Sequence, residues 1–374
     1  MPDGSRGGGE DHKSSQGVMA IVGRLKKLQL GRVALGYGIG LAGALLFVFF
    51  KLPLPWFLGA LTVCLVAAVL NAPFTSPRFM SIPVRAVLGV AIGAAFSPAM
   101  LDNIIGMIGS LLMLVPYMVV IIGGGMVFFQ RIARFDAPTA FFCAVPGGLT
   151  DMVTMATDAG ASARTVTLVQ ATRILLIVFL LPFWLQLADG QGLGGATLPG
   201  SSLVELGILD GLVLVGLGLF GWLLALRIGL AGAPLIGPMI LSGIVHAAGL
   251  TAAKVPVEIM TLAQVTLGVI LGAQFRGVTW KEFSTTLAWG SIFAVILVIV
   301  TGFVAIGVSS LTGFDSTSVL LAYAPGGQAE MNLLAYILGL DVAFTALHHL
   351  VRLAIVIFGA QIVFATRKDW RGDG

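Results

Sequence analysis

Long apolar runs joined by short polar connections fill most of this chain. Representative runs cover residues 33–50, 104–129, 175–187 and 292–308. A helix needs about 20 apolar residues to cross the hydrocarbon core of a bilayer. Only helices and closed barrels satisfy their own backbone hydrogen bonds there. The pattern therefore predicts an all-α polytopic membrane protein.

Each half of the chain is expected to cross the membrane five times. In the first half, the fifth crossing is the span that contains Arg173. The other predicted spans are residues 33–50, 54–71, 84–100 and 106–129, followed in the second half by 208–226, 233–250, 259–275, 286–310 and 343–365.

The two halves repeat one another at a constant offset of 179 residues. Under this offset Pro146-Gly147-Gly148 falls on Pro325-Gly326-Gly327, and Arg173 falls on Arg352. The period is far longer than that of a solenoid repeat, so each copy is half of one large unit. In membrane proteins such halves most often form a transporter whose binding site lies where they meet.

The segment 137–160 decides how the halves are oriented. Pro146-Gly147-Gly148 supplies the residue types that break a helix in mid-membrane. Each arm of about 11 residues is roughly 16 Å long, which is half of the hydrocarbon core. A re-entrant hairpin here, with its counterpart at 316–340, keeps the basic connections cytoplasmic. The sequence thus predicts two inverted repeats of five transmembrane helices plus one re-entrant helical hairpin each, with both termini cytoplasmic. A parallel arrangement of six plus six spans is the alternative.

Composition agrees with residence in the membrane. Charged residues make up 10% of the chain, against about 25% in ordinary soluble domains, and the mean hydropathy is +1.02. The formal net charge of +4 is spread over connections and ends, so it reports topology rather than nucleic-acid binding. We expect a disordered cytoplasmic tail at 1–31, membrane repeats at 32–190 and 208–366 with an extracytoplasmic linker at 191–207 between them, and a cytoplasmic tail at 367–374.

A break in each predicted hairpin exposes carbonyl groups on the first arm and amide groups on the second. These groups are ligands for a cation and an anion respectively. Asp151 and Glu330 lie in the first turn of the second arms, where the helix dipole favours a carboxylate. Each acid either caps a buried helix start or takes part in ion or proton coupling, and the sequence leaves both interpretations open.

Arg173 and Arg352 stand well inside their predicted spans. A guanidinium at that depth costs about 2.5–3.5 kcal/mol on insertion scales. Each should therefore pair with its hairpin carboxylate or hold an anionic substrate with two hydrogen bonds. His348 lies one turn before Arg352, so we expect it to line the same cavity.

These features predict a secondary transporter of a small, anionic organic solute, coupled to protons or sodium, with no cofactor and no enzymatic activity. Access would alternate by rocking of one bundle against the other. The predicted ion-coupling residues are Asp151, Glu330 and His348. The predicted substrate-binding residues are Pro146, Gly147, Gly148, Thr150, Arg173, Pro325, Gly326, Gly327, Gln328 and Arg352.

The duplicated motif resembles that of the bacterial membrane AbrB family. It reads Val145-Pro-Gly-Gly-Leu-Thr-Asp-Met in one half and Ala324-Pro-Gly-Gly-Gln-Ala-Glu-Met-Asn332 in the other. That family has an internal duplication of this size, it is unrelated to the small DNA-binding regulator of the same name, and the similarity covers about residues 30–370. The resemblance implies a protein of the bacterial inner membrane. Members carry labels such as regulator of AidB expression, transcriptional regulator or ammonia monooxygenase, without residue-level roles.

The residues argue against two of these labels. Copper or iron oxygen chemistry needs clustered ligands, and the 4 histidines have no convergent spacing, so no metal site is predicted. Direct transcriptional control needs a module with a basic face that reads DNA, for which only the short tails remain. The alternative left open is a non-transporting membrane protein that affects gene expression indirectly. The expected partners are the solute, the lipid bilayer and further copies of the chain in a homo-oligomer. Direct contact with nucleic acid is not expected.

Overall fold

The structure, a computed structural model, describes residues 10–96, 104–189 and 202–366, and within these ranges it contains helices and no strand. The first repeat comprises α1 (Glu10–Phe49), the π-helical turn η1 (Pro55–Gly59), α2 (Ala60–Val69), α3 (Ser81–Gly93), α5 (Ile104–Val127), α6 (Ala137–Ala144), α7 (Leu149–Asp158) and α8 (Ala163–Asp189). The second comprises α9 (Ile208–Arg227), α10 (Ala233–Ala247), α11 (Val257–Gly272), α12 (Trp280–Glu282), the π-helical turn η6 (Phe283–Leu287), α13 (Ala288–Thr312), α14 (Ser316–Tyr323), α15 (Gln328–Ile337) and α16 (Val342–Thr366).

Seven helices in the described ranges are long and apolar enough to cross a membrane, which confirms the polytopic all-α class. Four of them match the predicted spans at 33–50, 106–129, 208–226 and 259–275. The other three contain α8, α13 and α16 and match the predicted span around Arg173 and those at 286–310 and 343–365. The helices at the predicted spans 54–71, 84–100 and 233–250 are shorter than predicted, with lengths of 10 to 15 residues. Helix α1 begins at Glu10, within the predicted tail 1–31, and continues into the apolar span that follows.

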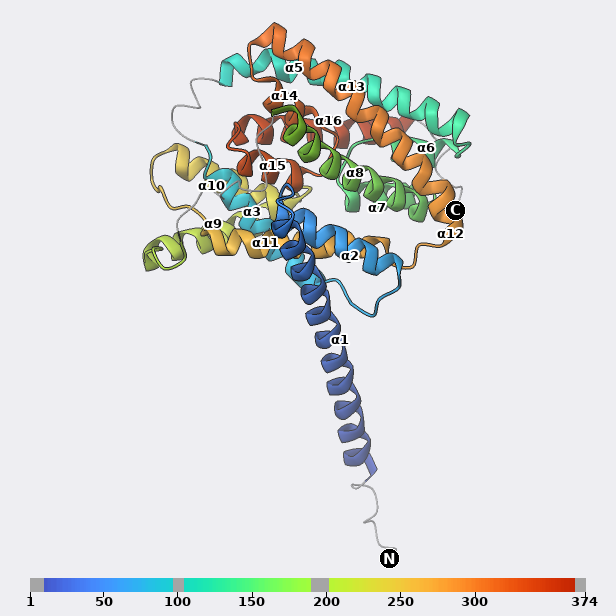
Figure 1. The fold of residues 1–374 in the computed structure, drawn as a ribbon, viewed down its shortest axis with the longest axis vertical. Helices are drawn as coiled ribbons and strands as arrows, with labels where there is room; N and C mark the ends of the chain where they lie inside the picture. Colours follow the sequence, from blue (N-terminus) through green and yellow to red (C-terminus); the bar gives the residue numbers. More distant parts are fainter. Residues whose placement is uncertain (1–9, 97–103, 190–201, 367–374) are drawn as a thin grey trace, which may run out of the picture.

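The two repeats interleave to form two bundles (Figure 1). The lower bundle in this view combines α1, α2 and α3 of the first repeat with α9, α10 and α11 of the second. The upper bundle combines α5, α6, α7 and α8 with α13, α14, α15 and α16. Helix α3 contacts α15 and α16 where the bundles meet. The repeats are therefore units of sequence, and each bundle takes half of its helices from each repeat.

Glycine pairs explain how the lower bundle is held together across the repeats. An ideal Cβ on Gly268 in α11 would lie 2.6 Å from the carbonyl oxygen of Phe57, and one on Gly272 would lie 2.8 Å from that of Leu61. The matching pair in α3, Gly89 and Gly93, approaches the backbone of α10 in the same way. Small residues four positions apart let membrane helices touch backbone to backbone. The third helix of each repeat thus packs against the second helix of the other repeat.

In each repeat, the start of the first arm (α6 or α14) lies close to the end of the second arm (α7 or α15). Asp136 caps α6 by accepting a hydrogen bond from the amide of Thr139 (3.1 Å). The hydroxyl of Thr139 in turn accepts from the amide of Ser162 (3.0 Å), which follows α7. In the second repeat Asp315 caps α14 through the amide of Ser318. There the rings of Phe314 and Phe344, on either side of α14 and α15, lie 4.7 Å apart.

Candidate functional site

Both Pro-Gly-Gly segments interrupt their helices, as the sequence predicts. In the first repeat, Val145 and Gly148 on either side of the break have extended backbone angles. In the second repeat, Ala324 and Gly327 are likewise extended. An ideal Cβ on Gly147 would lie 2.6 Å from the Met152 side chain. A side chain at position 147 would therefore clash with Met152, and glycine avoids this clash.

The carbonyl groups at the end of the first arm are satisfied by side chains of α8. Gln170 donates from Nε2 to the carbonyl of Phe142 (2.6 Å) and to that of Val145 (2.9 Å). Arg173 donates to the Val145 carbonyl from Nη1 (3.2 Å) and to the Gln170 amide oxygen from Nη2 (2.6 Å). The last carbonyl groups of a helix have no partner within the helix and need one when they are buried. These two side chains provide it for Phe142 and Val145, which are both buried.

The second repeat uses the same arrangement with one changed residue. Arg352 donates from Nη1 to the carbonyl of Ala324 (2.6 Å) and from Nη2 to that of Gly326 (3.2 Å). The ring of His349, at the position that matches Gln170, contacts the carbonyl oxygen of Leu321 through Nε2 (3.1 Å). A cation near the C-terminal end of a helix is favoured by the helix dipole. The arginines therefore stabilise the breaks, a role that neither sequence interpretation contained.

Only one of the two arginines reaches the cavity between the bundles. This cavity has a volume of about 350 Å³. It is lined by both breaks, Pro146–Gly148 and Gly326–Glu330, and by Arg352. Arg173 is 1% exposed and is not among the lining residues of the described chain. The predicted residues Pro146, Gly147, Gly148, Gly326, Gly327, Gln328, Glu330 and Arg352 are thus brought together, whereas Arg173 lies behind the first break and Pro325 is not part of the wall.

Of the two predicted carboxylates, Glu330 lies in the described wall of the cavity. Glu330 is 9% exposed, lines the cavity and folds back toward Gly327, the residue that precedes its helix. That position is the one from which an acid reaches the free amides of a helix start. The side chains of Thr150 and Asp151 lie outside the described residues. Among the described side chains, no ion pair joins Glu330 to Arg352.

His348 lies away from the described wall of the cavity, whereas its neighbour His349 is part of that wall. His348 is fully buried against α5, where its Nε2 lies 2.9 Å from the Ser110 hydroxyl and its Nδ1 lies 2.8 Å from the carbonyl of Phe344. His349, 1% exposed, lines the cavity. Both histidines lie within one turn of Arg352, so helical spacing alone admits either.

Two further polar residues that the predicted site does not include line the cavity. Arg85 lies in α3 and lines the cavity although its side chain is exposed. Gln274, directly after α11, lines this cavity and also a smaller one of about 210 Å³. The smaller cavity is walled by Arg164, Thr167 and Arg276. Basic side chains therefore line the smaller cavity.

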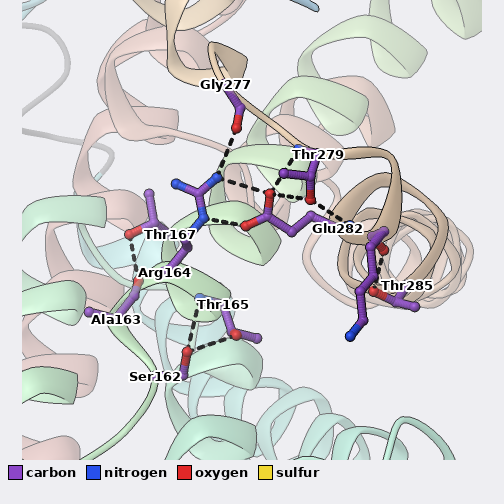
Figure 2. Close-up of polar contacts among 10 residues, drawn as sticks. Ser162, Ala163, Arg164, Thr165, Thr167, Gly277, Thr279, Glu282 and Thr285 are labelled. Atoms are coloured by element: carbon purple, nitrogen blue, oxygen red, sulfur yellow. Dashed lines mark hydrogen bonds and ion pairs between the residues drawn. The ribbon is translucent and has the colours of Figure 1, made fainter.

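An ion pair beside the smaller cavity links the start of α8 to α12, which continues through η6 into α13 (Figure 2). Arg164 at the start of α8 pairs with Glu282 and donates to the carbonyl of Gly277 (3.1 Å) in the connection from α11. The Glu282 carboxylate also accepts from the amide of Thr279 (2.8 Å), whose hydroxyl accepts from the Glu282 amide (3.3 Å). This reciprocal capping box fixes the carboxylate that faces Arg164.

Removing the charge of Glu282 is expected to have a small effect on stability. Glu282→Gln keeps an oxygen that accepts from Thr279 but loses the ion pair with Arg164. Because the Arg164 side chain is 58% exposed, the loss should be at most about 1 kcal/mol, and salt should screen it. Thermal unfolding of both proteins at low and high ionic strength measures the difference. A loss of several kcal/mol that persists in high salt would contradict this expectation.

Comparison with known proteins gives one family and one relative to which the chain is similar. The model of the AbrB family, described as "Transition state regulatory protein AbrB", matches residues 56–367. The chain is similar to the uncharacterized protein YhjN of Bacillus subtilis (strain 168), with 29% identity over 243 residues. That alignment covers 61% of this chain and 62% of the relative, which is less than two thirds of the relative's length.

Proposed function

The chain belongs to the AbrB family of membrane proteins, and we propose that it is a secondary transporter of a small anionic organic solute. The observation that carries the proposal is that both Pro-Gly-Gly breaks line one cavity between two interleaved bundles. Transporters built from repeats place their site where the repeats meet, at broken helices. The protein would act as a carrier rather than as an enzyme, in the bacterial inner membrane with both termini in the cytoplasm.

The charge of the cavity supports an anion as cargo. The described lining contains two arginines, Arg85 and Arg352, and one carboxylate, that of Glu330. The described wall therefore carries a net positive charge. The starts of α7 and α15, which are each 10 residues long, also meet at this cavity. Free amides and the positive dipole end of a helix favour an anion. Glu330, with Asp151 as its counterpart in the first repeat, would carry the coupling proton or coordinate sodium.

Solute flux tests the proposal directly. The purified full-length chain is reconstituted in liposomes, and uptake of labelled small carboxylates is measured with an imposed proton or sodium gradient. We expect saturable uptake that needs one of the two gradients. If no carboxylate enters above the rate of empty liposomes, the transport proposal fails. A non-transporting role in regulation, which the family description favours, would then be supported by a specific protein that co-purifies with the chain.

Cysteine labelling distinguishes inverted from parallel repeats. Ser162 and Asp341 occupy matching positions, each directly before the last helix of its repeat, and both are exposed. Ser162→Cys is expected to react with a membrane-impermeant thiol reagent only from the cytoplasmic side, and Asp341→Cys only from the outside. The native residues Cys64 and Cys143 are buried, so the unsubstituted protein serves as the unlabelled control. Labelling of both positions from one side would favour the parallel arrangement.

The contacts at the ends of the broken helices support the inverted arrangement. The hydrogen bond from the Ser162 amide to Thr139 brings the end of α7 back to the start of α6. A pair of arms that returns to its start does not add a crossing, and an odd number of crossings inverts the second repeat. The two tips would then approach the cavity from opposite sides of the membrane, as alternating access requires.

A further inference from the structure

The imidazole of His349 has one free nitrogen in a buried setting. Its Nε2 contacts the carbonyl of Leu321 (3.1 Å). Since a carbonyl oxygen only accepts hydrogen bonds, Nε2 carries the proton and donates it. The neutral ring then has an acceptor lone pair on Nδ1, and Nδ1 is buried without a partner among the described residues. A positive charge on this ring would lie beside the charge of Arg352, which donates to the carbonyl of Ala324 in the same break.

Two other polar atoms of the cavity residues have no partner. The amide nitrogen of Gln328 and the amide oxygen of Gln274 are buried without a hydrogen bond among the described residues. Both residues line the cavity together with His349 and Arg352. Each buried polar group left unpaired costs about 1–3 kcal/mol, and native structures contain few of them. A ligand in the cavity that forms hydrogen bonds with such atoms would remove this cost.

We infer that the solute is a small carboxylate that also bears a hydroxyl group, and this inference rests on the proposed anion site. The carboxylate binds Arg352 and the free amides at the start of α15. The hydroxyl hydrogen is donated to Nδ1 of His349. The hydroxyl oxygen accepts from the Gln328 amide. A carboxylate without a hydroxyl leaves the acceptor of His349 unpaired, so the cavity discriminates against it.

The first repeat provides a variant that removes this acceptor while the break stays satisfied. Gln170, at the position matching His349, donates from Nε2 to the helix carbonyls, and its Oε1 accepts from the neighbouring arginine (2.6 Å). In His349→Gln the same two bonds can form with Leu321 and Arg352, so the fold is kept and the free acceptor is lost. The reciprocal change Gln170→His lies outside the described lining of the cavity and serves as the matched control.

Binding of paired probes to the purified full-length chain tests the inference. The pairs are lactate with propionate, malate with succinate and 3-hydroxybutyrate with butyrate, measured by calorimetry in detergent. For at least one pair we expect the hydroxylated member to bind about 10- to 100-fold more tightly. His349→Gln should reduce this ratio to about 1, and Gln170→His should leave the ratio unchanged. Equal binding within every pair, no binding of any probe, or a ratio that survives His349→Gln would overturn the inference.

Uptake measured in parallel separates this inference from the proposed function. If hydroxylated and plain carboxylates enter liposomes equally well, transport stands and the hydroxyl requirement fails. If discrimination in binding depends on His349 but no probe crosses the membrane, the recognition stands and transport fails.

Discussion

Replacing Arg352 by alanine is expected to lower solute uptake about 10- to 100-fold, because a hydrogen bond to a charged partner contributes about 1.5–3 kcal/mol. Arg352 lines the cavity and at the same time holds the carbonyls of Ala324 and Gly326. Two of its N–H groups are used by these carbonyls, which leaves others for a carboxylate. Initial uptake rates per folded protein in liposomes measure the loss.

The duplicated arginine separates binding from stability. Arg173 makes equivalent hydrogen bonds to Val145 and Gln170 but is not among the described lining residues. Arg173→Ala should therefore lower the unfolding temperature as Arg352→Ala does, with a smaller effect on uptake by the folded fraction. Arg352→Lys keeps the charge but cannot hold two carbonyls with a planar fork, so an intermediate rate is expected. Equal losses of uptake for both alanine variants, after correction for folding, would remove Arg352 from the binding site.

The breaks could be predicted from the sequence because their cause is local. A proline with two glycines cannot continue a helix, and the duplication shows that the break occurs twice. The partner of each arginine could not be predicted in this way. The choice between a carboxylate and a carbonyl group depends on how α8 and α16 lie against the first arms, and apolar helices carry no polar face that reveals their rotation.

The choice between His348 and His349 shows the same limit and one way around it. Helical spacing places either residue within a turn of Arg352. The duplication, however, aligns His349 with the polar Gln170 and His348 with the apolar Val169. Since the matching residues occupy matching places, the polar member of the pair marks the face that meets the break. This signal was present in the sequence, whereas the position of Arg85 at the cavity depends on the packing of one bundle against the other.

The exchange of helices between the repeats also had a signal in the sequence. Gly89 and Gly93, and their matches Gly268 and Gly272, lie four residues apart in otherwise apolar helices. That spacing indicates a close helix contact, but it does not name the partner helix. The partner is fixed only by the fold, in which α11 crosses α2 and α3 crosses α10.

Gly268→Ala is expected to destabilise the protein by about 1–3 kcal/mol, the usual cost of overfilling a packed interior. The added Cβ would lie 2.6 Å from the carbonyl oxygen of Phe57 and 2.8 Å from the amide nitrogen of Leu61. Both atoms belong to the backbone of the opposite repeat, so no side chain can turn aside to make room. The helix axes would have to separate, and this would disturb the bundle that supports one side of the cavity.

Gly302→Ala provides the matched control for this contact. Gly302 lies in α13, another long apolar helix, and no heavy atom lies within 4 Å of its ideal Cβ. Alanine there should be neutral or stabilise the helix by up to about 1 kcal/mol. The unfolding temperature, measured in the same detergent, should therefore fall for Gly268→Ala and stay unchanged or rise for Gly302→Ala. If Gly268→Ala unfolds at or above the temperature of Gly302→Ala, then α11 and α2 do not touch backbone to backbone, and the exchange of helices between the repeats is wrong.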